Sequence, residues 1–218
     1  MKNWTRAVLF ANGDASHLSR LTISPADFLV AVDNGWRHLA ALGLTPDLLI
    51  GDLDSLPPAV LTKPGSQLTE VLRFPPEKDQ TDLELALDEV LKRGFQRVLV
   101  VGALGGRLDH TLGNLALLSR PDLAGLDCSL DDGTCSVRLV RSYALLATQP
   151  GDLVSLVPCN GDALGVSTTG LQYPLKHETL RADTARGISN VALGGQVEVH
   201  LAGGSLLLIH TPLNGGAI

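Results

Sequence analysis

Cysteine is scarce in this sequence. Only Cys128, Cys135 and Cys159 occur among its 218 residues, and no C-x-x-C pair is present. An odd number of cysteines without that spacing argues against a disulfide framework and against a structural zinc site. The sequence therefore indicates a reducing, cytoplasmic setting.

Basic residues are also few. Lysine and arginine together number 17 against 23 aspartates and glutamates, which gives a formal net charge of -6. Binding to nucleic acid depends on clustered basic side chains, so this balance excludes a general nucleic-acid-binding protein. An acidic protein can still bind a polyphosphate when a metal ion mediates the contact.

Long hydrophobic runs are missing. No window approaches the roughly 18 apolar residues that a membrane-spanning helix needs, and the segment 1–10 is too short and too polar for a signal peptide. We therefore expect no membrane association. Apolar residues still make up 44% of the chain and charged residues 18%, as is typical of a globular protein with a hydrophobic core.

The first two-thirds of the chain alternates short apolar runs with helical patterns. Helices are expected over 34–42, over 81–93 and from Asp109 to a stop before Pro121, with Thr81 and Asp109 as N-caps. The apolar runs lie at 7–10, 28–32, 48–50 and 98–101. Such alternation predicts a mostly parallel, Rossmann-like α/β sandwich whose ligands bind beyond the carboxyl ends of the strands.

The last third of the chain has a different pattern. It contains short β-rich segments separated by glycine, proline and asparagine, including one strand expected over 137–146. A hairpin is expected in which 197–201 and 205–210 are joined through Gly203-Gly204. The sequence thus predicts an α/β domain over 1–140, followed by an antiparallel β-sandwich domain over 141–218.

Acidic residues cluster in short motifs at or near the ends of the predicted strands. Carboxylates that hold Mg²⁺ present a net positive centre to the phosphates of ATP, and two aspartates separated by one residue can supply such ligands. Basic side chains beside them would contact phosphate directly. The residues concerned are Asp33, Asp52, Asp54, Asp79, Asp82 and Asp109, with Lys78 and Arg107 as the basic neighbours.

Each of these residues also has an ordinary structural interpretation. A D-x-D pair in a loop is most often solvated surface, and Asp82 is a favourable charge in a first helical turn. Asp109 is a natural N-cap, while His110 and Arg107 are common surface residues. The argument for a site therefore depends on their joint placement.

Six short motifs, taken in order, resemble those of the thiamine pyrophosphokinase family. In the first part of the chain they are V-D-N-G at 32–35, P-D-L-L-I-G-D-L-D-S at 46–55, K-D-Q-T-D at 78–82 and G-G-R-L-D-H at 105–110. In the second part they are S-T-T-G-L-Q-Y-P-L at 167–175 and I-S-N at 188–190. The resemblance extends over residues 30 to 210.

This resemblance implies an ATP-dependent transferase that makes thiamine diphosphate and AMP from thiamine and ATP, with Mg²⁺ as cofactor. It also implies a homodimer whose thiamine site lies at the subunit interface. Asp52, Asp54 and Asp82 would hold the metal and, with Lys78, act as the catalytic residues. Asp33, Asp79, Thr81, Arg107, Asp109 and His110 would bind ATP, and Ser167, Thr168, Tyr173, Ser189 and Asn190 would bind thiamine.

Departures from the family pattern leave alternatives open. Tyr173 stands where many members have tryptophan, Asn34 where glycine is common, and Gly187-Ile188 where Ser-Thr is usual. One alternative is a pyrophosphokinase for another hydroxymethyl heterocycle, such as a pterin, although that relative should lack the stretch 168–171. The others are a non-catalytic protein that binds ATP or thiamine, and a metal-dependent phosphohydrolase.

Overall fold

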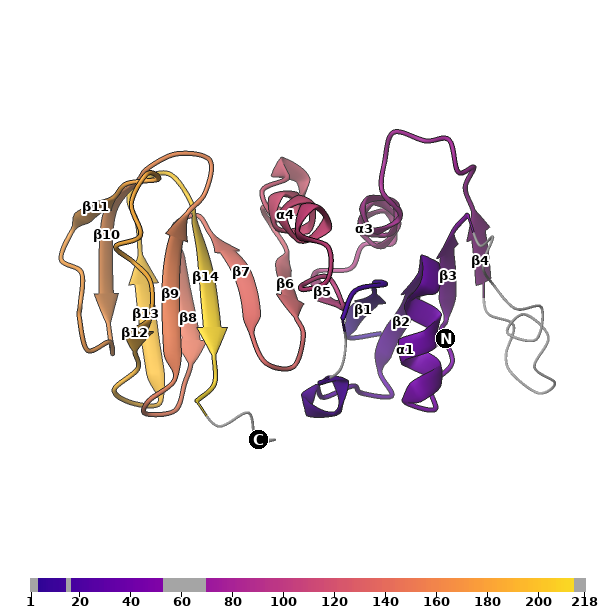
Figure 1. Ribbon diagram of the computed structural model, residues 1–218, viewed down its shortest axis with the longest axis horizontal. Coiled ribbons are helices and arrows are strands. Elements are labelled where there is room, and N and C mark those ends of the chain that lie inside the picture. The colour runs from indigo at the N-terminus through magenta and orange to yellow at the C-terminus, as the bar shows by residue number, and fades with distance from the viewer. Residues whose placement is uncertain (1–3, 15–16, 53–69, 214–218) are drawn as a thin grey trace. The chain divides into compact units, whose positions relative to one another are not determined.

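The structure is a computed structural model that describes residues 4–14, 17–52 and 70–213. Asp54, a predicted metal ligand, lies outside these residues. The chain divides into two compact units, Met1–Asp132 and Gly133–Ile218, where the sequence placed the division at residue 140. Figure 1 labels the helices and strands of both units.

The described part of unit 1 is built on a parallel sheet, as predicted. Its strands follow the order β6-β5-β1-β2-β3-β4, and every neighbouring pair is parallel. The apolar runs form β1 to β3 and β5, whereas β4 and β6 are more polar and were not predicted. The strands are β1 (Arg6–Phe10), β2 (Asp27–Val32), β3 (Leu48–Gly51), β4 (Glu70–Arg73), β5 (Arg97–Val101) and β6 (Asp127–Asp131).

The helices of unit 1 lie close to their predicted positions. They are α1 (Trp36–Ala41), α3 (Asp82–Lys92) and α4 (Leu108–Leu117), with 3-10 turns η1 (Leu18–Arg20), η2 (Asp33–Gly35) and η3 (Pro121–Leu123). Thr81 caps α3, since its Oγ1 accepts a hydrogen bond from the N–H of Glu84 at 3.2 Å. In the described ranges, no helix is long and apolar enough to cross a membrane.

The prediction that Asp109 caps α4 is wrong. The N-cap position belongs to Arg107, which makes no side-chain capping bond, and Asp109 lies in the first turn. The Asp109 carboxylate is instead held by the Arg107 guanidinium. A negative charge in the first turn still suits the helix dipole.

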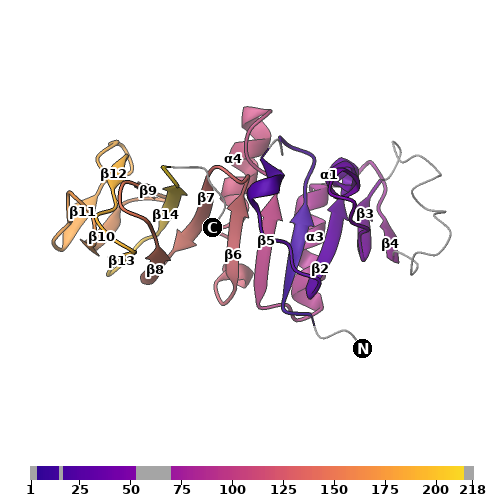
Figure 2. The ribbon, with the colours of Figure 1, turned by 90° about the horizontal axis from the view of Figure 1, so that it is seen from below.

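Both faces of the unit 1 sheet are covered. Val8, Phe10, Leu29 and Ala31 form one buried cluster with Leu39 of α1. The alternate strand residues point the other way and are buried too, and α3 contacts β1, β2 and β3. Figure 2 shows these strands side by side. The carboxyl ends of β1 to β3 are thereby fixed along one edge of a rigid sheet.

Unit 2 is an antiparallel β-sandwich, as predicted. One sheet has the order β12-β9-β14-β7 and the other the order β11-β10-β13-β8, and residues from both sheets share one buried cluster. The strands are β7 (Ser136–Val140), β8 (Tyr143–Ala147), β9 (Leu153–Pro158), β10 (Ala163–Thr169), β11 (Glu178–Leu180), β12 (Asn190–Val191), β13 (Gln196–His200) and β14 (Leu206–Thr211).

Two details of the sandwich differ from the prediction. The expected strand over 137–146 is interrupted at 141–142, because β7 lies in one sheet and β8 in the other. The expected hairpin at Gly203-Gly204 is also wrong, since β13 and β14 belong to opposite sheets. A Cβ at Gly204 would lie 2.3 Å from the carbonyl oxygen of Asp162, so this glycine serves a close crossing between the sheets.

Candidate active site

Three predicted site residues emerge at one edge of the unit 1 sheet. Asp33 follows β2, Asp52 follows β3, and Asp82 is the first residue of α3. All three are partly buried. Because β2 and β3 are parallel neighbours, their carboxyl ends lie at the same edge.

The electrostatics of Asp33 show that these carboxylates interact. Burial raises the pKa of Asp33, and the negative charges of Asp82 and Asp52 raise it further. The backbone N–H of Asn34 acts in the opposite direction and only partly offsets them. Neighbouring like charges favour either protonation or a bound cation, so this edge is a candidate cation site.

Backbone geometry brings these residues together. Gly51 has φ +148°, and a Cβ there would lie 3.2 Å from the Cα of Asp33. Asp33 itself is left-handed, with φ 48°, an uncommon conformation for a residue other than glycine. The chain thus places the end of β3 directly against the turn after β2.

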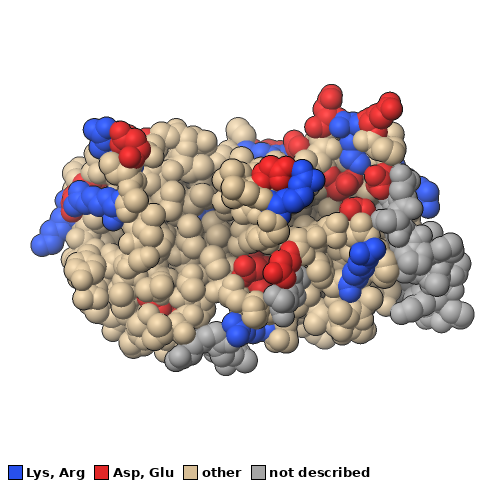
Figure 3. Space-filling model, viewed as in Figure 1, with Lys and Arg blue, Asp and Glu red and all other residues tan. Residues whose placement is uncertain are grey.

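Basic and acidic side chains mix on the connection between β4 and α3, where Figure 3 shows red and blue atoms gathered. Lys78 Nζ lies 2.6 Å from Asp82 Oδ1, with the two side chains 15% and 25% exposed. Asp79 is exposed, and the Thr81 hydroxyl caps α3. Lys78 is therefore the basic residue placed beside the carboxylates.

Among the described residues, no three histidine, cysteine, aspartate or glutamate side chains are close enough to form a ready-made metal cage. Mg²⁺ does not need one, because it commonly takes one or two protein carboxylates and completes its shell with water and phosphate oxygens. The partly exposed carboxylates of Asp52 and Asp82 fit that requirement.

A second group of predicted residues follows β5. Arg107 and Asp109 form an exposed ion pair with Nη2–Oδ2 at 2.5 Å, and this guanidinium lowers the pKa of Asp109 to about 2. His110 is exposed beside them. Arg107 is held by a carboxylate in this structure, yet its guanidinium is open to solvent and can meet an incoming phosphate.

The turn that carries Arg107 lets a ligand approach the main chain closely. Its residues Gly105 and Gly106 have φ +76° and +70°. Asn114 Nδ2 donates to the carbonyl of Ala103 at 2.8 Å, and the hydroxyl of Thr111 donates to that of Gly105 at 3.2 Å. This turn follows β5, which neighbours β1 at the point where the strand order reverses. Ligands of open parallel sheets bind at such a point.

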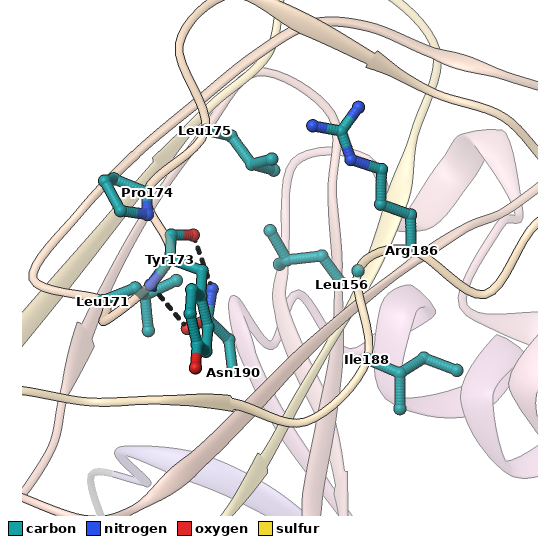
Figure 4. A pocket seen from close by; sticks show the side chains of 9 residues that line it. Leu156, Leu171, Tyr173, Pro174, Leu175, Arg186, Ile188 and Asn190 are labelled. Carbon is teal, nitrogen blue, oxygen red and sulfur yellow. Dashed lines mark hydrogen bonds between the residues drawn. The ribbon is translucent and has the colours of Figure 1, made fainter.

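Unit 2 contains a pocket of about 190 Å³, shown in Figure 4. It holds two of the predicted thiamine-binding residues, Tyr173 and Asn190, which face each other across two hydrogen bonds. Most of the lining residues have apolar side chains, and one lining side chain is charged. The lining residues are Leu156, Leu171, Tyr173, Pro174, Leu175, Arg186, Gly187, Ile188 and Asn190.

Ser167 and Thr168 support the pocket instead of lining it. The Ser167 hydroxyl accepts from the N–H of His177 at 2.9 Å, and the buried Thr168 hydroxyl accepts from the N–H of Leu175 at 2.9 Å. Ser189 is left-handed, with φ 58°, and its N–H donates to the Ser155 hydroxyl at 2.9 Å. These predicted residues fix the loops that carry the lining.

Sequence reasoning missed several lining residues. Pro174 and Leu175 lie inside the motif at 167–175, but their side chains carry no functional group that indicates a binding role. Arg186 lies just before the I-S-N motif, so its charge was the available signal. Leu156 comes from β9, whose proximity depends on the sandwich itself.

Comparisons with known proteins agree with this two-unit arrangement. Residues 19–130 match the sequence profile described as "Thiamin pyrophosphokinase, catalytic domain". Residues 143–206 match the profile described as "Thiamin pyrophosphokinase, vitamin B1 binding domain". The carboxylate edge lies in the first match and the pocket in the second.

Individual proteins named thiamine pyrophosphokinase are also similar to this chain in sequence. The chain is 28% identical to thiamine pyrophosphokinase of Bacillus subtilis over 184 residues, which cover 84% of this chain and 86% of that protein. It is 27% identical to thiamine pyrophosphokinase 1 of Oryza sativa over 67% of this chain and 59% of the rice protein. The chain thus spans less than two thirds of that plant relative.

Solved structures extend the similarity to the fold. The crystal structure of the Bacillus subtilis thiamine pyrophosphokinase superposes with a TM-score of 0.84 at 25% identity, covering 95% of this chain and 99% of that one. A thiamin pyrophosphokinase family protein from Enterococcus faecalis gives 0.80 at 28% identity, covering 94% and 98%.

Proposed function

This chain belongs to the thiamin pyrophosphokinase family, and we propose that it transfers the pyrophosphoryl group of ATP to the hydroxyl of thiamine. The products are thiamine diphosphate and AMP. The match of the second unit to a vitamin B1 binding domain supports thiamine over a pterin as the acceptor.

The convergence of Asp33, Asp52 and Asp82 is the observation that carries the proposal. Three separate sequence motifs bring their carboxylates to one edge of the sheet, where burial and mutual repulsion raise the pKa of Asp33. Such a charge surplus is costly unless a cation relieves it. A metal ion bound together with a polyphosphate would relieve the repulsion between these carboxylates.

Mg²⁺ fits these residues. Asp52 and Asp82 would hold it, together with Asp54, which belongs to the same G-D-L-D-S motif as Asp52. When bound, the metal would supply positive charge that offsets the negative charge developing during transfer.

The chain's own basic groups would orient the triphosphate. Lys78 lies beside Asp82 and would contact a phosphate oxygen close to the carboxylates. Arg107, exposed next to Asp109, would contact another through two parallel N–H groups. Asp79, Asp109 and His110 would border the nucleotide, while Thr81 keeps the start of α3 in place.

Held in this way, the β-phosphorus is open to attack by the thiamine hydroxyl. The new bond joins the hydroxyl oxygen to that phosphorus, and the bond from the β-phosphorus to the oxygen on the α-phosphate breaks. The hydroxyl proton is lost, and AMP leaves with the electron pair. Catalysis in such reactions rests mainly on positioning and charge stabilisation.

The acceptor would bind in the pocket of unit 2. The Tyr173 ring offers a flat face to a heterocycle or a cation, and leucine side chains beside it offer apolar contacts. Tyr173 and Ile188 are 66% and 51% exposed, so the pocket mouth presents apolar surface that a second surface would cover. We propose that the protein is a homodimer and that the partner's unit 1 provides this cover.

Phosphorus NMR of the purified protein with ATP, Mg²⁺ and thiamine tests the function. We expect AMP and thiamine diphosphate to appear together, and we expect Asp54→Ala and Asp82→Ala to abolish turnover while the fold, followed by circular dichroism, persists. ADP or free phosphate as the product would contradict pyrophosphoryl transfer. Near-normal turnover in both variants would remove the carboxylates from the mechanism.

A further inference from the structure

The charges in and beside the unit 2 pocket bear on whether it can bind a cation. Arg186 is the one charged side chain among the described residues that line it. The thiazolium ring of thiamine carries a fixed positive charge, so the acceptor and Arg186 repel each other. This inference rests on the proposed function, because it concerns how the same pocket admits a cation.

Arg186 cannot retreat from the pocket by a shift of its backbone. The neighbouring Gly187 carbonyl accepts from the N–H of Leu156 at 2.8 Å, and a Cβ at Gly187 would lie 2.1 Å from the Leu156 carbonyl oxygen. Two residues on, the N–H of Ser189 donates to Ser155 on the same strand. The segment is thus fastened along β9, which holds the backbone of Arg186 beside the pocket.

A carboxylate stands beside this arginine. Glu178, the first residue of β11, forms an ion pair with Arg186 through Oε2 and Nη2. The Glu178 side chain is 30% exposed and that of Arg186 is 57% exposed, so solvent screens the pair and its contribution to stability is small. Its local effect is to cancel the one positive charge that lines the pocket.

We propose that Glu178 is a specificity-determining residue: its carboxylate neutralises Arg186 and so allows the pocket to take a cationic heterocycle. Glu178 does not line the pocket, and it acts through the arginine. Without it, the pocket becomes positive and favours neutral or anionic heterocycles of the same shape.

A charge-matched pair of ligands tests this role. Binding of thiamine, and of its neutral isostere with a thiophene in place of the thiazolium ring, is measured by calorimetry in the absence of ATP. In Glu178→Gln we expect thiamine to bind about tenfold more weakly, near the low end of the range for unit charges several ångströms apart, because solvent screens this pair. The neutral isostere should change by less than about twofold, and added salt should shrink the thiamine defect.

Arg186→Gln supplies the complementary arm. Alone it should bind thiamine at least as tightly as the wild type, and combined with Glu178→Gln it should recover most of the lost affinity. A matched control is Asp183→Asn, which removes one carboxylate from the exposed Arg181–Asp183 pair of the same unit, neither residue of which lines the pocket. This control should leave both affinities unchanged.

The outcomes distinguish the role of Glu178 from the identity of the pocket. Equal weakening of both ligands in Glu178→Gln, or a double variant that fails to recover, would overturn the electrostatic role of Glu178. Wild-type protein that binds neither ligand would overturn the thiamine pocket itself, and the role of Glu178 with it.

Discussion

Asn190 holds the main chain of Tyr173 with two hydrogen bonds. Its Nδ2 donates to the Tyr173 carbonyl at 2.7 Å, and its Oδ1 accepts from the Tyr173 N–H at 3.1 Å. The same Oδ1 accepts from the N–H of Val191 at 2.9 Å. The Tyr173 side chain is 66% exposed, so the order of this aromatic residue depends on a side chain 17 residues further along the chain.

Asn190→Ala should therefore weaken thiamine binding without touching the chemistry. Losing the two hydrogen bonds to Tyr173, of about 1 kcal/mol each, should raise the KM for thiamine by up to about thirtyfold, while kcat and the KM for ATP change little. Tyr173→Ala should act in the same direction. Steady-state kinetics measure this, with Thr169→Ala, at the end of strand β10, as a control. Unchanged KM values in both variants would remove this pair from the acceptor pocket.

Asp33→Asn should stabilise unit 1 at neutral pH and impair turnover. Burial, with the charges of Asp82 and Asp52, raises the pKa of Asp33 in the folded state, so the folded protein binds the proton more tightly than the unfolded chain. The wild type therefore loses stability as pH rises through that raised pKa. Asparagine removes this penalty, and Tm at pH 7 should rise by about 2 °C.

The pH dependence distinguishes this cause from altered packing. The advantage of Asp33→Asn should be full at pH 7 and should disappear as pH falls toward the ordinary aspartate value of 3.8, where the wild-type carboxyl is protonated as well. Thermal unfolding across this pH range measures it. A Tm gain that persists at low pH would mean that charge is not the reason.

The carboxylate edge could be predicted from the sequence, because it depends on local signals. Asp33 and Asp52 each follow an apolar run, and parallel neighbours bring their ends together. The two glycines before Arg107 indicate that it lies in a turn, but the local sequence does not predict its ion pair with Asp109. The proximity of Asp82 to Asp33 depends on where α3 begins over the sheet, which capping by Thr81 determines.

The sandwich was harder to predict, because its contacts are distant in sequence. Gly203-Gly204 has the pattern of a hairpin turn, yet β13 pairs with β8 and β14 pairs with β7 and β9. A local glycine pair cannot reveal that the chain changes sheets. The pocket likewise joins Leu156 to Arg186 through strand packing, for which the motifs carry no signal.

Arg107→Ala should separate binding from stability. The Arg107–Asp109 pair is more than 60% exposed on both sides, so its loss should leave Tm unchanged within about 1 °C. The KM for ATP should rise about tenfold, since a charged phosphate contact is lost. Arg181→Ala removes an equally spaced, equally exposed pair from unit 2 and is the matched control. Equal effects of the two variants on the KM for ATP would contradict a phosphate role for Arg107.

Gly51→Ala should damage the site more than the fold. The added Cβ would lie 3.2 Å from the Cα of Asp33, at a φ of +148° that side chains rarely adopt. The strain, about 1 to 3 kcal/mol, would fall on the junction that brings Asp33 against Asp52. Gly43→Ala is the control, because its φ is +68° but nothing lies within 4 Å of the added atom. Both variants should lower Tm by a few degrees, whereas only Gly51→Ala should reduce kcat, by more than about tenfold. A similar kcat in the two variants would mean that the approach of β3 to Asp33 does not set the geometry of the carboxylates.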